Sequence, residues 1–375
     1  MSFPFKLMGC QLNPLKTAKY SFILGLFTAG PKSSRNVHQY RNLVPWKNAI
    51  ELSQHLIGTV IYNDNGFLVF NKPYGVSFSR SGNAAEIQKE KNMKPEEKVF
   101  KKPNKQSKDF INNQYYTSGI VSDSLSLVDC LPYIKNHFGY KKLYISRVPG
   151  KYVSGVAILT TNPELVDKVN VVHAHAPTGK DKYTAVVVGV PRHSSGVVRL
   201  GLKLEFKENI GKKPVILQEF SNNAVKDGKI RMGTFHHETL QHGFNNLTSL
   251  VKICVDLRAY NALRVFAADH LLAPVLGDNL YGGRVQTLMG IATSTHHFSE
   301  AALRPQVLPE EVYSMLQVDR SNAGIIPVHV HLSEMVLPKM LRGKPLHLSA
   351  SLPPHFEWTC HKLGLTQEQE AISAV

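Results

Sequence analysis

The sequence predicts an α+β fold, with a mixed, largely antiparallel sheet and flanking helices. Three segments support this prediction. Residues 249–257 alternate apolar and polar side chains, as an antiparallel strand with one buried face does. Residues 183–190 are nearly all apolar, which indicates a central strand buried on both faces. Residues 125–138 place apolar side chains three or four positions apart, which indicates a helix.

The N-terminal half is expected to combine helices with a strand pair. In chain order, helices are expected at 51–58, 125–138 and 162–172, and strands at 60–62 and 67–70. Asn63-Asp64-Asn65-Gly66 is a turn sequence and joins the two strands. Pro132 is tolerated in its helix only if that helix begins late, near Asp129. Asn162-Pro163-Glu164 combines an N-cap, a first-turn proline and an acid, and therefore opens the third helix.

The C-terminal half is expected to hold most of the sheet. Strands are expected within 197–216, 232–255 and 328–332, helices over 260–272 and 353–364, and an irregular crossover over 285–324. His329 and His331 place two imidazoles on one face of a strand. Two ligands without a third do not make a metal site, so we expect no metal there.

Composition favours a nucleic-acid partner. The chain has 375 residues and a formal net charge of +16, which favours a polyanion over a neutral partner. A basic tail is the alternative explanation of this charge. The four cysteines lie far apart without a CxxC pair, so a reducing compartment is expected. No apolar run approaches the roughly 18 residues that a membrane span needs.

Residues 1–50 have the composition of a mitochondrial transit segment, because they contain seven Lys or Arg residues and no Asp or Glu. This predicts a location in the mitochondrial matrix. A secretory signal with its apolar region at 22–27 is the alternative. We expect one domain over 51–375, interrupted by a charged, disordered insertion at 83–108. That insertion is either a solvated loop or a contact for RNA phosphates.

Residues 143–159 form the stretch around which the other motifs are arranged. They read as a strand, a tight polar turn and a second strand, with Pro149-Gly150 at the turn. A turn between two apolar strands is a place where a rigid scaffold can present reactive groups. Further motif segments lie, in chain order, at 68–75, 182–189, 263–265, 274–282 and 326–332.

In this order the segments resemble the RluA-type RNA pseudouridine synthases, over roughly residues 58 to 365. The resemblance implies the synthase catalytic domain and the isomerisation of uridine to pseudouridine in RNA, without a metal or organic cofactor. Such an enzyme takes the base out of its stack, and it uses a carboxylate, an aromatic platform and a cation. Substrate RNA would then be mitochondrial mRNA or rRNA.

The central turn departs from the family. The family carries His-Arg-Leu-Asp there, and the Asp is its catalytic residue. This chain has Ser146-Arg147-Val148-Pro149-Gly150, so that Pro149 or Gly150 occupies the aspartate position, depending on the side from which one counts. Neither residue can act as a nucleophile or a base. The departure resembles that of one branch of the family, the mitochondrial mRNA pseudouridine synthase homologues of animals.

The resemblance implies two catalytic-site residues. Tyr183 matches the tyrosine that stacks on the base, and Arg264 matches the basic residue that pairs with the aspartate. The predicted RNA-binding residues are Lys72, Arg147, Lys151 and Arg258.

Loss of the aspartate has an electrostatic consequence at Arg264. A buried arginine without a partner is costly, so we expect a phosphate to take the missing place. The prediction is an RNA-binding cleft without the catalytic carboxylate, and pairing of Arg264 with an Asp or Glu of this chain would contradict it. Asp256, Asp269 and Asp278 are the carboxylates near enough in sequence, and Asp278 is expected to stabilise its own turn.

These features leave three hypotheses. The first is a pseudouridine synthase that draws its carboxylate from elsewhere in the chain. The second is a catalytically inactive RNA-binding protein acting in mitochondrial RNA processing or ribosome assembly, with proteins of those processes as partners. The third is a basic interaction protein whose cleft has decayed.

Overall fold

The computed structural model describes residues 37–79, 125–174, 181–257 and 259–366. Residues 1–36 of the transit-like segment, the predicted insertion at 83–108 and Arg258 lie outside the described residues. Residues 39–375 form one compact unit. This unit therefore includes residues 39–50, which precede the domain start predicted at residue 51. Tyr40 explains the difference, because its side chain is fully buried against Trp358 and His329.

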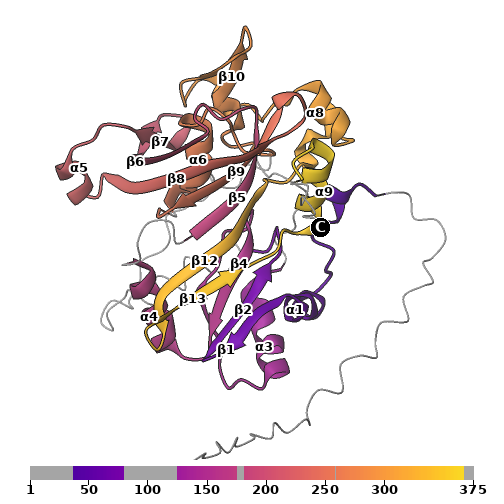
Figure 1. The fold of residues 1–375 in the computed structure, drawn as a ribbon, viewed down its shortest axis with the longest axis vertical. Helices are drawn as coiled ribbons and strands as arrows, with labels where there is room; N and C mark the ends of the chain where they lie inside the picture. The colour runs from indigo at the N-terminus through magenta and orange to yellow at the C-terminus, as the bar shows by residue number, and fades with distance from the viewer. Residues whose placement is uncertain (1–36, 80–124, 175–180, 258, 367–375) are drawn as a thin grey trace, which may run out of the picture. The chain divides into compact units, whose positions relative to one another are not determined.

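One sheet of eleven strands organises the described part of this unit (Figure 1). The strand order is β1-β2-β4-β12-β5-β9-β8-β6-β7, with β3 paired to β4 and β13 paired to β12. The strands are β1 Val60–Asp64, β2 Phe67–Lys72, β3 Tyr144–Arg147, β4 Ser154–Thr160, β5 Asp181–Val188, β6 Ser195–Lys207, β7 Gly211–Leu217, β8 Ile230–His242, β9 Thr248–Val255, β12 Val330–Leu341 and β13 Lys344–Ser349. Among the described pairs, β4 and β12 run parallel and the others antiparallel, so the predicted mixed, largely antiparallel sheet is confirmed.

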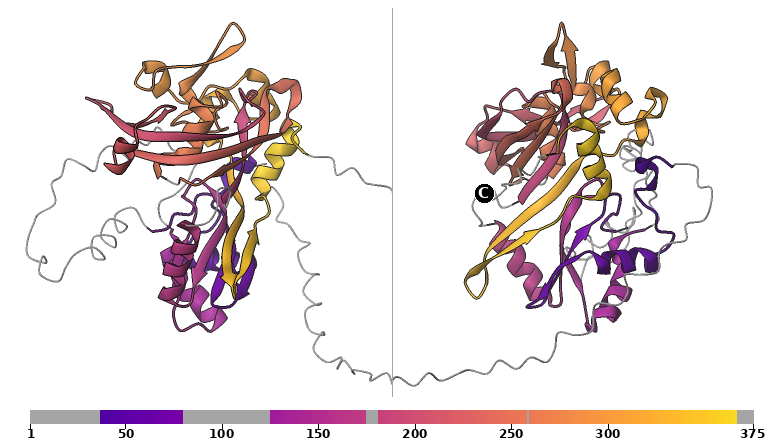
Figure 2. Two further views of the ribbon diagram at one scale, coloured as in Figure 1. Left: turned by 60° about the vertical axis from the view of Figure 1, so that its left-hand side comes forward. Right: turned by 45° about the vertical axis from the view of Figure 1, so that its right-hand side comes forward.

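Helices cover both faces of the sheet. They are α1 Ala49–Gly58, α3 Leu127–Phe138, α4 Pro163–Ala174, α5 Asn222–Lys226, α6 Ala262–Asp269, α7 Glu300–Leu303, α8 Glu310–Met315 and α9 Pro354–Leu363. The sheet twists so strongly that β6 and β8 run across β12 and β4, as both views in Figure 2 show. No helix in the described ranges has the length and apolar character to cross a bilayer.

Strand β4 shows why these residues form a central strand. Val156 and Ile158 face one hydrophobic cluster, while Ala157 and Leu159 face another that contains residues of α1 and α3. Side chains alternate between the two faces of a strand, so a continuous apolar run is stable only where both faces are covered. β5 meets the same requirement, with Ala185 and Val187 on one side and Val186 on the other, so the predicted buried strand is confirmed.

Three local predictions need correction. Helix α3 begins at Leu127, earlier than Pro132 suggested, because Ser126 and Asp129 form a capping box that stabilises its first turn. The region 285–324 is not wholly irregular, since β10 Val285–Leu288 and β11 Ile291–Ser294 form a separate two-stranded hairpin. The predicted strand at 328–332 is also longer than expected and continues into the hairpin of β12 and β13.

Candidate functional site

A pocket of about 250 Å³ lies where the turn after β3, the start of β5, the end of β9 and the start of α6 meet. Its described lining residues are Val148, Pro149, Gly150, Val153, Tyr183, Val255, Leu257, Asn261, Ala262, Leu263, Arg264 and Val330. The structure thus brings together three motifs that are far apart in the sequence: the central turn, the β5 tyrosine and the α6 arginine.

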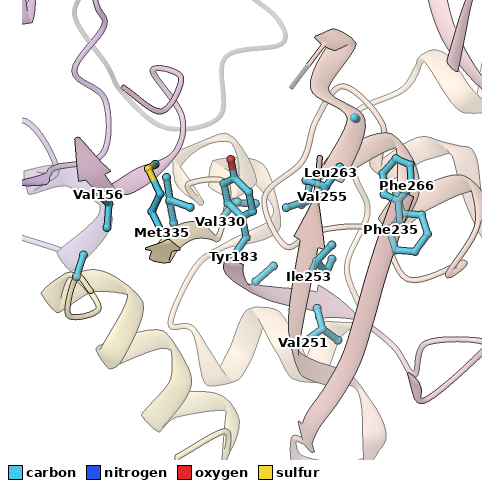
Figure 3. Packing of buried hydrophobic residues seen from close by; sticks show 14 of the residues in the cluster. Val156, Tyr183, Phe235, Val251, Ile253, Val255, Leu263, Phe266, Val330 and Met335 are labelled. Carbon is cyan, nitrogen blue, oxygen red and sulfur yellow. The ribbon is translucent and has the colours of Figure 1, made fainter. Parts of the chain in front are cut away.

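Tyr183 contributes its ring to an apolar wall of the pocket. Strand β5 directs the side chain to the same face as Ala185 and Val187, and only 7% of the residue is exposed. Figure 3 shows Tyr183 beside Val330, with Val255 and Leu263 on its other side. A partly covered aromatic ring in such a wall is suited to stacking on a flat base.

The central turn supplies Val148, Pro149 and Gly150 to the pocket wall, so both positions that could match the family's aspartate face the same cavity. Backbone hydrogen bonds hold the turn: Val153 N–H donates to the carbonyl of Gly150 at 3.1 Å, and Gly75 N–H to that of Lys151 at 2.9 Å. None of the described lining residues is an Asp or Glu. The described wall therefore offers no carboxylate to a bound nucleotide.

Arg264 is paired, which overturns the expectation that a phosphate would replace its lost partner. Its Nε donates to Asp278 Oδ2 at 2.8 Å, and a second guanidinium nitrogen donates to Asp278 Oδ1. Burial alone would lower the pKa of Arg264, but the charge and hydrogen bonds of Asp278 hold it above its usual range.

Asp278 also accepts hydrogen bonds from the backbone N–H groups of Leu280 and Tyr281, at 3.0 and 3.1 Å. The predicted role of Asp278 in its own turn is therefore confirmed. The expectation of a phosphate beside Arg264 failed because a carboxylate that stabilises a turn can also bind a side chain of a neighbouring helix. The sequence does not show that α6 lies against this turn.

Asp181 is a buried carboxylate that sequence reasoning missed. Its side chain is fully buried, His173 Nε2 lies 2.9 Å from one oxygen, and an Arg147 nitrogen lies 3.8 Å from the other. Asp181 precedes Tyr183 by two residues on β5, so both side chains lie on one face of that strand. The sequence feature that could have indicated Asp181 is an acidic residue at the start of a largely apolar strand.

Comparisons with known proteins agree with this geometry. No family model matches the chain. It is 29% identical over 254 residues to the mouse mitochondrial mRNA pseudouridine synthase Rpusd3, a match that covers 65% of this chain and 71% of the relative. The human RPUSD3 of the same description is 29% identical over 253 residues, covering 64% and 69%. The zebrafish mitochondrial pseudouridylate synthase RPUSD4 is 28% identical over 246 residues, covering 62% and 63%.

The chain is a homologue of mitochondrial pseudouridine synthases. This confirms the resemblance found in the motifs. The relatives are named as mitochondrial proteins, which supports the mitochondrial location predicted from residues 1–50. Among solved structures, human RNA pseudouridylate synthase domain containing 4 matches with a TM-score of 0.56 at 21% identity, covering 85% of this chain and 98% of that one. At this identity the match shows the shared fold.

Lys72 does not face a substrate in this pseudouridine synthase homologue, which corrects its prediction as an RNA contact. The side chain is fully buried at the end of β2, and Nζ donates to the carbonyls of Pro73 and Val76 at 2.9 and 3.0 Å. Burial lowers the pKa of Lys72 to about 7. A phosphate cannot reach the Lys72 ammonium in this buried position, so we assign Lys72 a structural role.

The remaining predicted RNA contacts differ in their surroundings. Lys151 is partly exposed on the central turn, with Nζ 5.4 Å from the centre of the Tyr152 ring. Arg147 is directed towards Asp181, and its side chain is only 14% exposed. Lys151 is therefore the described candidate whose position best suits a phosphate contact.

His329 and His331 lie in the core of the fold. His329 and His331 are fully buried, and burial lowers the pKa of each to about 4. His331 accepts from the Ser154 hydroxyl at Nδ1 and donates from Nε2 to the Ala350 carbonyl. His173 and His237 are also buried. No group of side chains suited to a metal ion occurs within the described ranges.

Proposed function

We propose that this chain is a pseudouridine synthase-like protein of mitochondrial RNA, which takes a uridine of mRNA or rRNA into the pocket beside Tyr183. One observation carries the proposal: in a homologue of these synthases, the central turn, Tyr183 and Arg264 line a single pocket. Tyr183 would stack on the base, with its hydroxyl near the proton that departs from C5. The net charge of +16 supports binding to the RNA backbone, with the mitochondrial matrix as the place of action.

Turnover would require a carboxylate from outside the described wall. Asp181 is the first candidate, because β5 carries it on the same face as Tyr183. It would have to leave His173 and Arg147 to reach a nucleotide, since its side chain is fully buried between them. Exchange of Asp181 for Asn would then abolish isomerisation.

A second function is favoured by the absence of an Asp or Glu among the described lining residues of the pocket. The pairing of Arg264 with Asp278 does not support it, because this guanidinium is not open to a phosphate. In this second function the protein binds a uridine-containing RNA without converting it and acts in mitochondrial RNA processing or ribosome assembly. Proteins of those processes would be its partners. The two functions share the pocket and differ only in turnover.

Tritium release from mitochondrial RNA labelled with [5-³H]uridine separates the two functions. Isomerisation exchanges the hydrogen at C5, so an active enzyme releases tritium from this RNA. Release by the purified protein that is lost in both Tyr183→Phe and Asp181→Asn would establish a synthase with a relocated carboxylate. Salt-sensitive binding of the same RNA without release would establish the RNA-binding function. An absence of RNA binding at low salt would contradict both.

A further inference from the structure

Among the described residues that line the pocket, few side chains are polar, and only Asn261 is uncharged and open to solvent. Nine of its twelve described lining residues are apolar or have no polar side chain; the others are Tyr183, Asn261 and Arg264. Arg264 is committed to Asp278, and Tyr183 is 7% exposed, whereas Asn261 is an exposed residue at the pocket wall. Apolar walls with a single amide suit a flat, uncharged heterocycle better than a phosphate.

The backbone holds Asn261 in an unusual conformation. Its φ and ψ are 55° and 40°, and those of Tyr260 before it are 57° and 30°. Two successive left-handed residues that are not glycine are energetically unfavourable and occur where the surrounding structure enforces them. Asparagine tolerates this region better than most residues, whereas tyrosine does not. The strain therefore lies at the edge of the pocket, directly before α6.

A hydrogen bond orients the carboxamide of Asn261. Its Nδ2 donates to the hydroxyl of Tyr281 at 3.1 Å. Tyr281 is itself fixed, because it is 6% exposed, its backbone N–H donates to Asp278, and Arg264 lies over its ring at 5.3 Å. The Asp278 turn that binds Arg264 thus also sets the position of Asn261.

One amide hydrogen is used by Tyr281, which leaves Oδ1 as an acceptor and the second hydrogen as a donor. Uracil presents a donor at N3 next to an acceptor at O4, whereas cytosine presents an acceptor at N3 next to an amino donor. We infer that Asn261 reads the base in the pocket, accepting from N3–H and donating to O4, with Tyr281 as a positioning residue that fixes the order of acceptor and donor. This inference rests on the function proposed above and adds the residue that selects uridine.

The test compares the affinities of the full protein for oligouridine and oligocytidine of equal length, measured by fluorescence anisotropy. The two strands carry the same phosphates, so backbone electrostatics largely cancel in the ratio. Two neutral hydrogen bonds predict about a tenfold preference for oligouridine in the wild-type protein. Asn261→Ala should bring the ratio close to one. Tyr281→Phe should reduce the preference with a smaller loss of affinity, because the amide is then free to turn over.

Asn209→Ala is the matched control. Asn209 also has a left-handed backbone, with φ 62°, and is exposed between β6 and β7, so it reports the cost of alanine in this conformation away from the pocket. Asn261→Asp keeps the size and tolerates the backbone but removes both donors, and it should also lose the preference. An Asn261→Ala protein that still prefers oligouridine would overturn the inference and leave the proposed function intact. A wild-type protein that binds both strands equally would overturn the inference as well, and one that binds neither would overturn both.

Discussion

Of the arginines that the motifs assigned to the site, the two that the structure describes are paired with carboxylates of the same chain. Arg264 forms a two-point pair with Asp278, and Arg147 shares Asp181 with His173. Buried charges are stable only when paired, so neither arginine leaves an unbalanced positive charge at the pocket. At this scale, the described pocket wall is mainly apolar, with a few hydrogen-bonding side chains.

Removal of one member of the Arg264–Asp278 pair should destabilise the fold strongly. Asp278→Ala leaves a buried guanidinium and two backbone N–H groups without their acceptor, and should lower the free energy of unfolding by about 3–5 kcal/mol. Urea denaturation measures this change. Arg304→Ala, in an exposed pair with Glu300, should cost less than about 1 kcal/mol. Similar losses in the two variants would contradict the importance of burial.

Stability should fall as the pH drops below 6.5. His329 and His331 have ordinary pKa values of 6.5 that burial lowers to about 4, so between these values the unfolded chain binds protons that the folded chain does not. Each histidine contributes a slope of up to about 1.4 kcal/mol per pH unit. Urea denaturation between pH 7 and 4 tests this, with His331→Gln expected to flatten the slope and His361→Gln, at an exposed position on α9, expected to leave it unchanged. Equal slopes in the wild-type, His331→Gln and His361→Gln proteins would refute the assignment of this pH dependence to the buried histidines.

At the scale of elements, the close contact between β4 and β12 depends on a glycine. Gly155 has φ +116°, and a side chain there would overlap the backbone carbonyl of Leu332 on the parallel neighbour. Gly155→Ala should therefore reduce stability by about 3 kcal/mol or more. Gly58→Ala at the end of α1 meets nothing within 4 Å and should change stability by less than about 1 kcal/mol. Thermal unfolding of the two variants gives the comparison, and an unaffected Gly155→Ala protein would show that the strands can separate at low cost.

The elements themselves could largely be predicted from local sequence. The turn between β1 and β2, the opening of α4 at Pro163 and the buried strand β5 all follow from short-range patterns that the structure confirms. The partners of charged side chains could not be predicted, because burial of Lys72 and pairing of Asp181 and Asp278 depend on which distant segments meet. The residues of the candidate pocket could be proposed from the sequence because the order of the motifs resembles that of a known family. Such a resemblance indicates which distant segments meet, which local periodicity does not.

At the scale of the whole molecule, the logarithm of the association constant for RNA should fall linearly with the logarithm of the salt concentration. Each phosphate contact to a single strand contributes about 0.7 to the slope, so Lys151→Ala should reduce the slope by about that amount. Lys72→Met removes a formal charge of the same type from a fully buried position and should leave the slope unchanged. Fluorescence anisotropy at several salt concentrations measures the slope for the Lys151→Ala and Lys72→Met variants. A change of slope in Lys72→Met, with its fold intact by circular dichroism, would mean that the segment after β2 opens to RNA.

The pairing of Arg264 with Asp278 bears on whether a carboxylate placed in the central turn could act chemically. Pro149→Asp would put a carboxylate in the turn, but it would face valine and leucine walls and an arginine whose charge is already balanced. Apolar surroundings favour the protonated acid, which is a poor nucleophile and a poor base. We therefore expect this single substitution to produce no isomerisation, because activity would require a rearranged charge network as well. The pair thus makes a gain of function at this turn depend on several simultaneous substitutions.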